Sequence, residues 1–179
     1  DNRNARLHAT MVAGRLNLLP RPPPGGSTER LRGRIRTAML VSLKDLPIRD
    51  EYETQQITAA VASSTAVTDE LSEAALSYAA GILDRASAVV LQIPAITKQP
   101  NNTISTAAIQ GLSAVLAATS AHAARLERAV AKAITTTAGH AITNLLNADL
   151  QNRVTDEEPI RRQTEHLSVI GGRYKMAAS

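Results

Sequence analysis

The sequence contains no cysteine, no tryptophan and no phenylalanine, and three tyrosines supply its whole aromatic content of 2%. Without cysteine, the chain has neither disulfides nor thiolate metal sites. Without aromatic rings among its arginines, it lacks the stacking platforms that bind single-stranded nucleic acid. We therefore do not expect a nucleic-acid partner. No run approaches the ~20 apolar residues that span a bilayer.

The apolar residues, 44% of the chain, are mainly alanine, leucine, isoleucine and valine. A buried methyl group contributes about 0.8 kcal/mol, against about 1.5–3 kcal/mol for a buried leucine or isoleucine. A core rich in alanine lets helices approach closely but stabilises them weakly. We therefore expect a helical domain that is stabilised in part by neighbouring protein.

The positive charge is concentrated at the start of the chain. Residues 1–36 carry eight arginines against Asp1 and Glu29, within a net charge of +4. The stretch PRPPPGGS at residues 20–27 combines proline, which fixes φ, with two glycines, and this is typical of a linker. We predict that residues 1–26 form a solvated basic Pro/Gly-rich arm or linker outside the ordered domain.

Apolar residues recur at helical spacing from residue 27 to about residue 150. In the first helix, Leu31 and Ile35 mark the apolar stripe, and the neighbouring arginines lie mostly off it. Asp50 and Glu53 form a capping-box pattern at the start of the second helix. Five helices with short connections indicate an antiparallel bundle. The predicted core positions are Leu71, Ile82, Leu112 and Ile134.

The C-terminal segment, residues 154–179, has a different character. An acidic turn ends in Pro159, and HLSVIGGRYKM then alternates apolar and polar residues around Gly171 and Gly172. This pattern predicts a strand, or a strand pair about a tight turn at the glycines. Because a lone strand pair cannot bury itself, we expect the first strands of a β subdomain that continues outside this chain. The predicted fold is all-α over residues 27–153, with a short C-terminal β segment.

The sequence shows no arrangement typical of catalysis or metal binding. The four histidines, none in a metal-ligand spacing, are His8, His122, His140 and His166. Ser113 follows Gly111 as in a nucleophile elbow, but the second glycine is missing and the position falls within a helix. Asp149 and residues 156–158 are interpreted as a solvated acidic link. We predict a non-enzymatic protein with no cofactor and no metal.

One modification motif is present. Asn101, Asn102 and Thr103 form an acceptor triplet for N-glycosylation, and they fall in the loop predicted between the third and fourth helices. Such a glycan is added only in the secretory pathway. Asn101 is therefore the glycosylation candidate if the chain is secreted.

Residues 31–87, LRGRIRTAMLVSLKDLPIRDEYETQQITAAVASSTAVTDELSEAALSYAAGILDRAS, resemble the helical part of the receptor-for-egg-jelly module of polycystin-1-like proteins. The shared order is a helix, a link at Asp50–Glu53, QQI opening a second helix, and a turn at Glu70–Ser72 opening a third. A second similarity covers NRVTDEEPIRRQTEHLSVIGGRYKM, in which an acidic-proline turn leaves the last helix for the first strands.

The resemblance implies a GAIN-like arrangement, in which a helical subdomain precedes a β-sandwich subdomain with a self-cleavage site before a membrane span. His166-Leu167-Ser168 spells such a site, but it lies in the first predicted strand and not in the last, so we do not assign it. The implied function is a non-enzymatic scaffold on the extracellular face of the plasma or ciliary membrane. Its implied partners are its own β subdomain, the neighbouring ectodomain and a channel-forming polycystin.

The alternative is an accessory helical subunit of a large intracellular or organellar assembly. Residues 1–19 are rich in arginine and nearly free of acid, as organelle-targeting segments are. The chain also begins at Asp1 and not at methionine, which predicts processing or excision from a larger protein. A glycan on Asn101 would separate the two hypotheses.

Overall fold

The computed structural model describes residues 2–93, 103–151 and 153–173. These residues form helices α1 (Asn2–Leu18), α2 (Ser27–Lys44), α3 (Glu51–Thr65), the short 3₁₀ helix η1 (Thr68–Glu70), α4 (Glu73–Gln92), α5 (Thr103–Ala121) and α6 (Arg128–Leu150), and strands β1 (Ile160–Gln163) and β2 (Ser168–Gly171).

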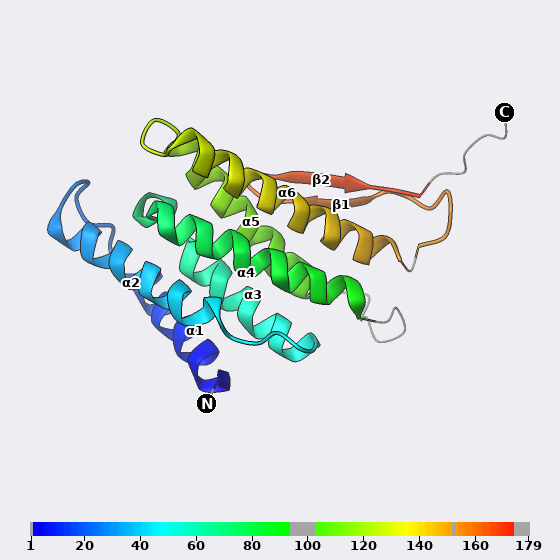
Figure 1. Cartoon of the computed structure of the whole chain (residues 1–179), viewed down its shortest axis with the longest axis horizontal. Coiled ribbons are helices and arrows are strands. Elements are labelled where there is room, and N and C mark those ends of the chain that lie inside the picture. The colour runs from blue at the N-terminus through cyan, green and yellow to red at the C-terminus, as the bar shows by residue number, and fades with distance from the viewer. Residues whose placement is uncertain (1, 94–102, 152, 174–179) are drawn as a thin grey trace.

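The helices are arranged in two layers of three (Figure 1). Helices α1, α3 and α5 are neighbours in one layer, and α2, α4 and α6 are neighbours in the other. Consecutive helices run antiparallel. Because odd-numbered and even-numbered helices lie in different layers, the chain crosses from one layer to the other at each connection. The predicted all-α class with a C-terminal strand segment is confirmed, with one helix more than the five expected.

Helix α4 lies at the centre and contacts α2, α3, α5 and α6. Among the described helices it alone combines the length of a membrane span with a mean hydropathy of 1.3, and half of that stretch is buried inside the protein. A helix surrounded by four others must be apolar on most of its surface. The composition of α4 therefore follows from its central position.

The four predicted core positions all lie in the interior, each at most 3% exposed: Leu71, Ile82, Leu112 and Ile134. Alanine also fills much of the core, and Ala75, Ala79 and Ala86 of α4 are fully buried. Small side chains bring the helices close together. At Gly111 of α5, an added Cβ would lie 3.1 Å from Leu83 of α4.

The predicted start of α3 is confirmed by its cap. Asp50 Oδ1 accepts a hydrogen bond from Glu53 N–H at 2.7 Å, and Glu53 Oε2 accepts one from Arg49 N–H at 2.9 Å. Ser72 begins α4 in the same way, with Oγ accepting from Ala75 N–H at 3.1 Å. Each cap satisfies a donor that the first helical turn leaves free.

Strands β1 and β2 pair antiparallel. Thr164 closes the turn between them, because its N–H donates to Leu167 O at 2.8 Å and its Oγ1 accepts from Leu167 N–H at 3.0 Å. The predicted strand before the glycines is therefore confirmed as β2, whose partner is β1; a second strand after Gly172 would fall on residues 174–179, outside the described residues. Gly171 ends β2, where an added Cβ would lie 3.1 Å from Leu146 of α6.

The hairpin packs on the helices of this chain. Ile160 and Val169 are each 7% exposed, and Thr164 Oγ1 donates to Ser113 Oγ of α5 at 2.6 Å. The hairpin thus contacts α5 through Thr164 and α6 beside Leu146. The expectation of a β subdomain that continues outside this chain stays a prediction.

Residues 1–26 were expected to form a solvated arm, but residues 2–18 form α1, which packs against α3 and α2. Ala9, Ala13 and Leu16 recur on one face of α1 and are buried. The Pro/Gly-rich stretch connects α1 to α2. Because it joins two packed helices, it does not separate an arm from a domain.

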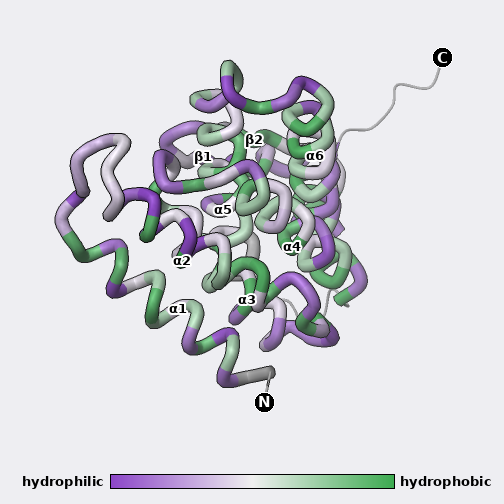
Figure 2. Tube along the Cα trace, turned by 60° about the vertical axis from the view of Figure 1, so that its left-hand side comes forward, coloured by the Kyte–Doolittle hydropathy of each residue, from purple (hydrophilic) through white to green (hydrophobic). Residues whose placement is uncertain are grey.

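The predicted apolar stripe of α2 is also wrong at its start. Leu31 is 55% exposed, whereas Arg32 and Arg36 are buried. The buried face of α2 runs through Arg32, Arg36, Leu40 and Leu43, and these positions follow helical spacing. Figure 2 shows hydrophilic and hydrophobic positions alternating along α1 and α2.

Two leucine-to-alanine variants test this burial pattern. Leu112→Ala should lower the free energy of unfolding by about 2–5 kcal/mol, because it leaves a cavity in the core. Leu31→Ala should change it by less than about 0.5 kcal/mol, because the side chain is exposed. Urea denaturation measures both values. Equal losses in the two variants would contradict the orientation of α2.

Candidate functional site

Two arginines and one glutamate form a buried charge cluster between α2 and η1. Arg36 Nε donates to Glu70 Oε2 at 2.6 Å, and Arg32 Nε lies 2.7 Å from Glu70 Oε1. Arg32 and Arg36 are one helical turn apart on α2, so both reach the same carboxylate. All three side chains are at most 5% exposed.

The remaining guanidinium nitrogens of the cluster bind the ends of two helices. Arg32 Nη2 donates to Leu16 O of α1 at 2.9 Å, and Arg32 Nη1 donates to Pro20 O at 2.8 Å. Arg36 Nη1 donates to Ser64 O of α3 at 3.2 Å. The last carbonyls of a helix have no partner within it. The two arginines therefore cap the C-terminal ends of α1 and α3.

Asn17 joins α1 to the same network. Its Oδ1 accepts from Arg36 Nη2 at 2.8 Å, and its Nδ2 donates to Ser63 O of α3 at 3.0 Å. The half-buried amide thus uses both of its ends. Through Asn17, Arg36 and Glu70, four elements (α1, α2, α3 and η1) share one hydrogen-bonded network.

The charges of the cluster are balanced by the helices that it caps. Arg32 and Arg36 exceed Glu70 by one positive charge. A helix C-terminus carries roughly half a negative charge, because the peptide dipoles align. The ends of α1 and α3 together offset the excess. This balance explains how two arginines lie in the interior with a single carboxylate.

Gly33 allows η1 to approach the cluster. It lies on α2 between Arg32 and Arg36, and an added Cβ would be 2.7 Å from the backbone oxygen of Glu70. Only a residue without a side chain leaves room for the backbone of η1 at this distance. The position of the Glu70 carboxylate therefore depends on glycine at residue 33.

Arg6 stabilises the N-terminal end of α1. Its side chain is buried, with Nη2 donating to Pro47 O at 2.5 Å and Nη1 lying 3.3 Å from Glu53 Oε1. Helix α1 is thus held near its start by its own arginine and at its end by Arg32 of α2. These contacts account for the order of a segment whose composition predicts a solvated arm.

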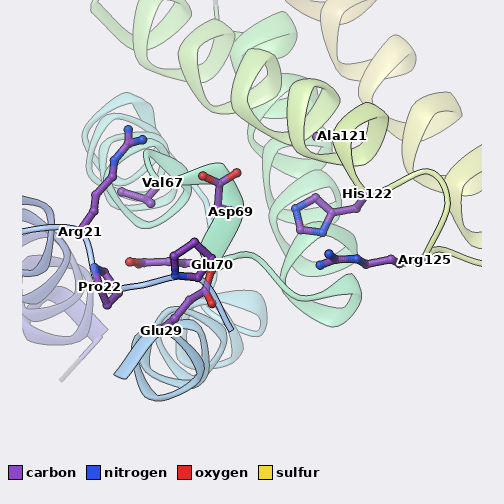
Figure 3. Close-up of a pocket in the computed structure, with 10 residues that line it drawn as sticks. Arg21, Pro22, Glu29, Val67, Asp69, Glu70, Ala121, His122 and Arg125 are labelled. Atoms are coloured by element: carbon purple, nitrogen blue, oxygen red, sulfur yellow. The ribbon is translucent and has the colours of Figure 1, made fainter. Parts of the chain in front are cut away.

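An open groove runs beside the cluster, along the outer side of α2. We call it the α2 groove. It comprises two adjoining hollows that share Glu29, Asp69, Glu70, His122 and Arg125. The larger hollow has a volume of about 970 Å³. Figure 3 shows His122 and Arg125 reaching in from the connection between α5 and α6, with Arg21 on the opposite side.

Arginine dominates the charge of the α2 groove. Its lining includes Arg21, Arg30, Arg34 and Arg125. Outside the charge cluster, two carboxylates, Glu29 and Asp69, line the same surface. The apolar part of the larger hollow is lined by Ala38 and Val41, which are exposed, and by Leu71, which is 3% exposed. The groove therefore offers an apolar surface with positively charged margins.

Three of the histidines, His122, His140 and His166, lie apart from one another. His140 Nδ1 lies 2.6 Å from Asp84 Oδ1 and links α6 to α4 at the surface. His166 lies in the turn of the hairpin, and His122 lines the α2 groove. Within the described residues, no group of three or more potential metal-ligating side chains comes together.

The other candidates from the sequence also have local roles or lie outside the structure. Ser113 is within α5 and accepts a hydrogen bond from Thr164. Asp149, interpreted as part of a solvated link, instead pairs with Arg162 of β1 at 3.1 Å. Asn101, the glycosylation candidate, lies outside the described residues.

Sequence reasoning did not predict the charge cluster, although the sequence carries a signal for it. Arg32 and Arg36 continue the stripe of Leu40 and Leu43 at helical spacing. Two arginines at core positions of an amphipathic helix indicate a buried carboxylate elsewhere. The spacing does not say which carboxylate, because Glu70 is 34 residues from Arg36.

Comparisons with known proteins do not assign this site. No family model matches the chain, and no curated protein or solved structure shows significant similarity to it. Function is therefore inferred from the geometry and from the residues themselves.

Removing the shared carboxylate should destabilise the fold. Glu70→Gln leaves two buried arginines without an ionic partner, so the free energy of unfolding should fall by about 3–5 kcal/mol. Asp69→Asn is the matched control, because this neighbouring side chain is exposed; its effect should stay below about 0.5 kcal/mol. Urea denaturation compares them, and equal effects would show that the cluster does not stabilise the protein.

A glycine-to-alanine pair tests the close approach of η1. Gly33→Ala should lower the free energy of unfolding by about 1–3 kcal/mol, because the backbone of Glu70 must move. Gly139→Ala in α6 meets nothing within 4 Å and should raise it by about 0.5–1 kcal/mol through helix propensity. Thermal melting followed by circular dichroism distinguishes the two signs. A stabilising Gly33→Ala would refute the contact.

Proposed function

We propose that this chain is a non-enzymatic helical scaffold and an extracellular module of a polycystin-1-like membrane protein. The buried charge cluster is the observation that carries the scaffolding role. The buried charged side chains of the described residues, Arg6, Arg32, Arg36 and Glu70, all bridge separate elements. Charges used in this way specify one arrangement of the helices.

The C-terminal hairpin supports the second half of the proposal. In the described part of the chain, β1 and β2 pair with each other, and each keeps an outer edge to which a further strand can add. A GAIN-like module places a β subdomain directly after its helices. The hairpin, docked on α5 and α6, would be the first two strands of that subdomain.

The proposed partners follow from this arrangement. The β subdomain would grow from the hairpin and contact the helical layers, and the neighbouring ectodomain and a channel-forming polycystin would be bound by the assembled module. The assignment to polycystin-1-like proteins rests on the resemblance of residues 31–87 and of the acidic-proline segment after α6. The scaffolding role rests on the contacts of the charge cluster.

The glycan is the most direct test of the extracellular assignment. The chain purified from its native source should carry an N-glycan on Asn101, because the triplet would pass through the secretory pathway. Intact mass before and after enzymatic removal of N-glycans, with peptide mapping over Asn101, measures this. An unmodified mass equal to the 19.0 kDa of the sequence would overturn the ectodomain proposal and favour a subunit of an intracellular or organellar assembly.

A further inference from the structure

The α2 groove has a length that suits an extended partner. Its lining follows one face of α2 through Arg30, Arg34, Thr37 and Val41. At 1.5 Å per residue, the span from Arg30 to Val41 is about 16 Å. This corresponds to about three turns of a bound helix. The opposite wall is formed by η1, by the start of α4 and by the connection between α5 and α6.

The surface of the groove is amphipathic. Ala38 and Val41 are exposed on α2 and give the larger hollow its accessible apolar surface, whereas Leu71 also lines it but is 3% exposed. An exposed apolar groove between helices commonly binds the apolar face of an amphipathic partner helix. Such a helix contacts the groove through an apolar side chain at every third or fourth residue. The groove thus has the features of helix recognition.

The margins of the groove define the charge of the partner. Arg34 on α2 and Arg125 on the opposite wall are both exposed, and Arg30 and Arg21 extend the positive charge along the groove. Glu29 and Asp69 offset part of this charge, and the Glu29 carboxylate also accepts a hydrogen bond from Gly25 N–H; the four arginines still exceed these two carboxylates. Complementary charge steers and orients a partner, and here it favours carboxylates.

We propose that the α2 groove binds an acidic amphipathic helix of a partner protein, with its apolar face on Ala38 and Val41 and its carboxylates facing Arg34 and Arg125. This inference does not depend on the polycystin-like assignment, because it uses only the shape and charge of the groove. An anionic membrane fits less well, since the arginines stand on facing walls of a hollow that a flat bilayer does not enter.

The test uses the full chain and two labelled amphipathic peptides of about 15 residues, the length of four helical turns. Both carry leucine at every third or fourth position, with glutamate elsewhere in one and lysine elsewhere in the other. Fluorescence anisotropy should show binding of the glutamate peptide, weakened by added salt. The lysine peptide should bind at least roughly tenfold more weakly.

Charge reversal then locates the site. The double variant R34E/R125E should lose roughly tenfold or more in affinity for the glutamate peptide and gain affinity for the lysine peptide. The matched control is R49E/R161E, which changes the same charge at two exposed arginines that do not line the groove. The control should change either affinity by less than about twofold. Circular dichroism melting establishes that both variants fold.

Several results would overturn the proposal. The glutamate peptide could fail to bind, the two peptides could bind equally, or the control variant could lose as much affinity as R34E/R125E. A photo-crosslinking glutamate peptide should label residues 30–41 and 121–125; labelling confined to other segments would also refute it. Co-sedimentation with phosphatidylserine vesicles that requires Arg34 and Arg125 and is not displaced by the peptide would identify a membrane site instead.

Discussion

The Glu70 carboxylate, held between two arginines of one helix, is the contact on which the rest of this structure depends. Each carboxylate oxygen meets one guanidinium, and the same two side chains reach the C-terminal ends of α1 and α3. A core rich in alanine gives each helix contact a small gain in free energy. A few buried charged contacts can then determine how the helices are positioned.

The local features of the fold were predictable from the sequence. The cap at Asp50, the helical class and the buried positions of Leu112 and Ile134 all follow from residue spacing within single helices. The structure adds what spacing cannot provide. Arg32 and Arg36 carry charged side chains, yet both are buried. Their burial is possible because the Glu70 carboxylate and the C-terminal ends of two helices lie within hydrogen-bonding reach. Their partners are distant in the sequence, so a local pattern assigns the arginines to solvent.

The same cause explains what sequence spacing missed at both ends of the chain. Most large apolar residues of helix α1 are exposed, and its order comes in part from Arg6 and from contacts that Arg32 supplies from another helix. The hairpin turn is set by Thr164, which also contacts Ser113 of α5. The candidate groove was equally hidden, since its walls come from segments far apart in the chain. The sequence showed an excess of arginine near its start, but it did not show that some of these arginines line a groove.

The shared carboxylate also constrains how this sequence can diverge. Losing Glu70 alone leaves two buried guanidinium groups without an ionic partner. Losing either arginine removes both a helix cap and one contact with the Glu70 carboxylate. Substitution of any one of the three residues lowers stability, whereas replacing all three together by apolar residues can preserve a packed core. Arg32, Arg36 and Glu70, with Gly33 between the arginines, should therefore be inherited as one unit. Among descendants of this chain, that set would persist or disappear together while the surrounding surface drifts.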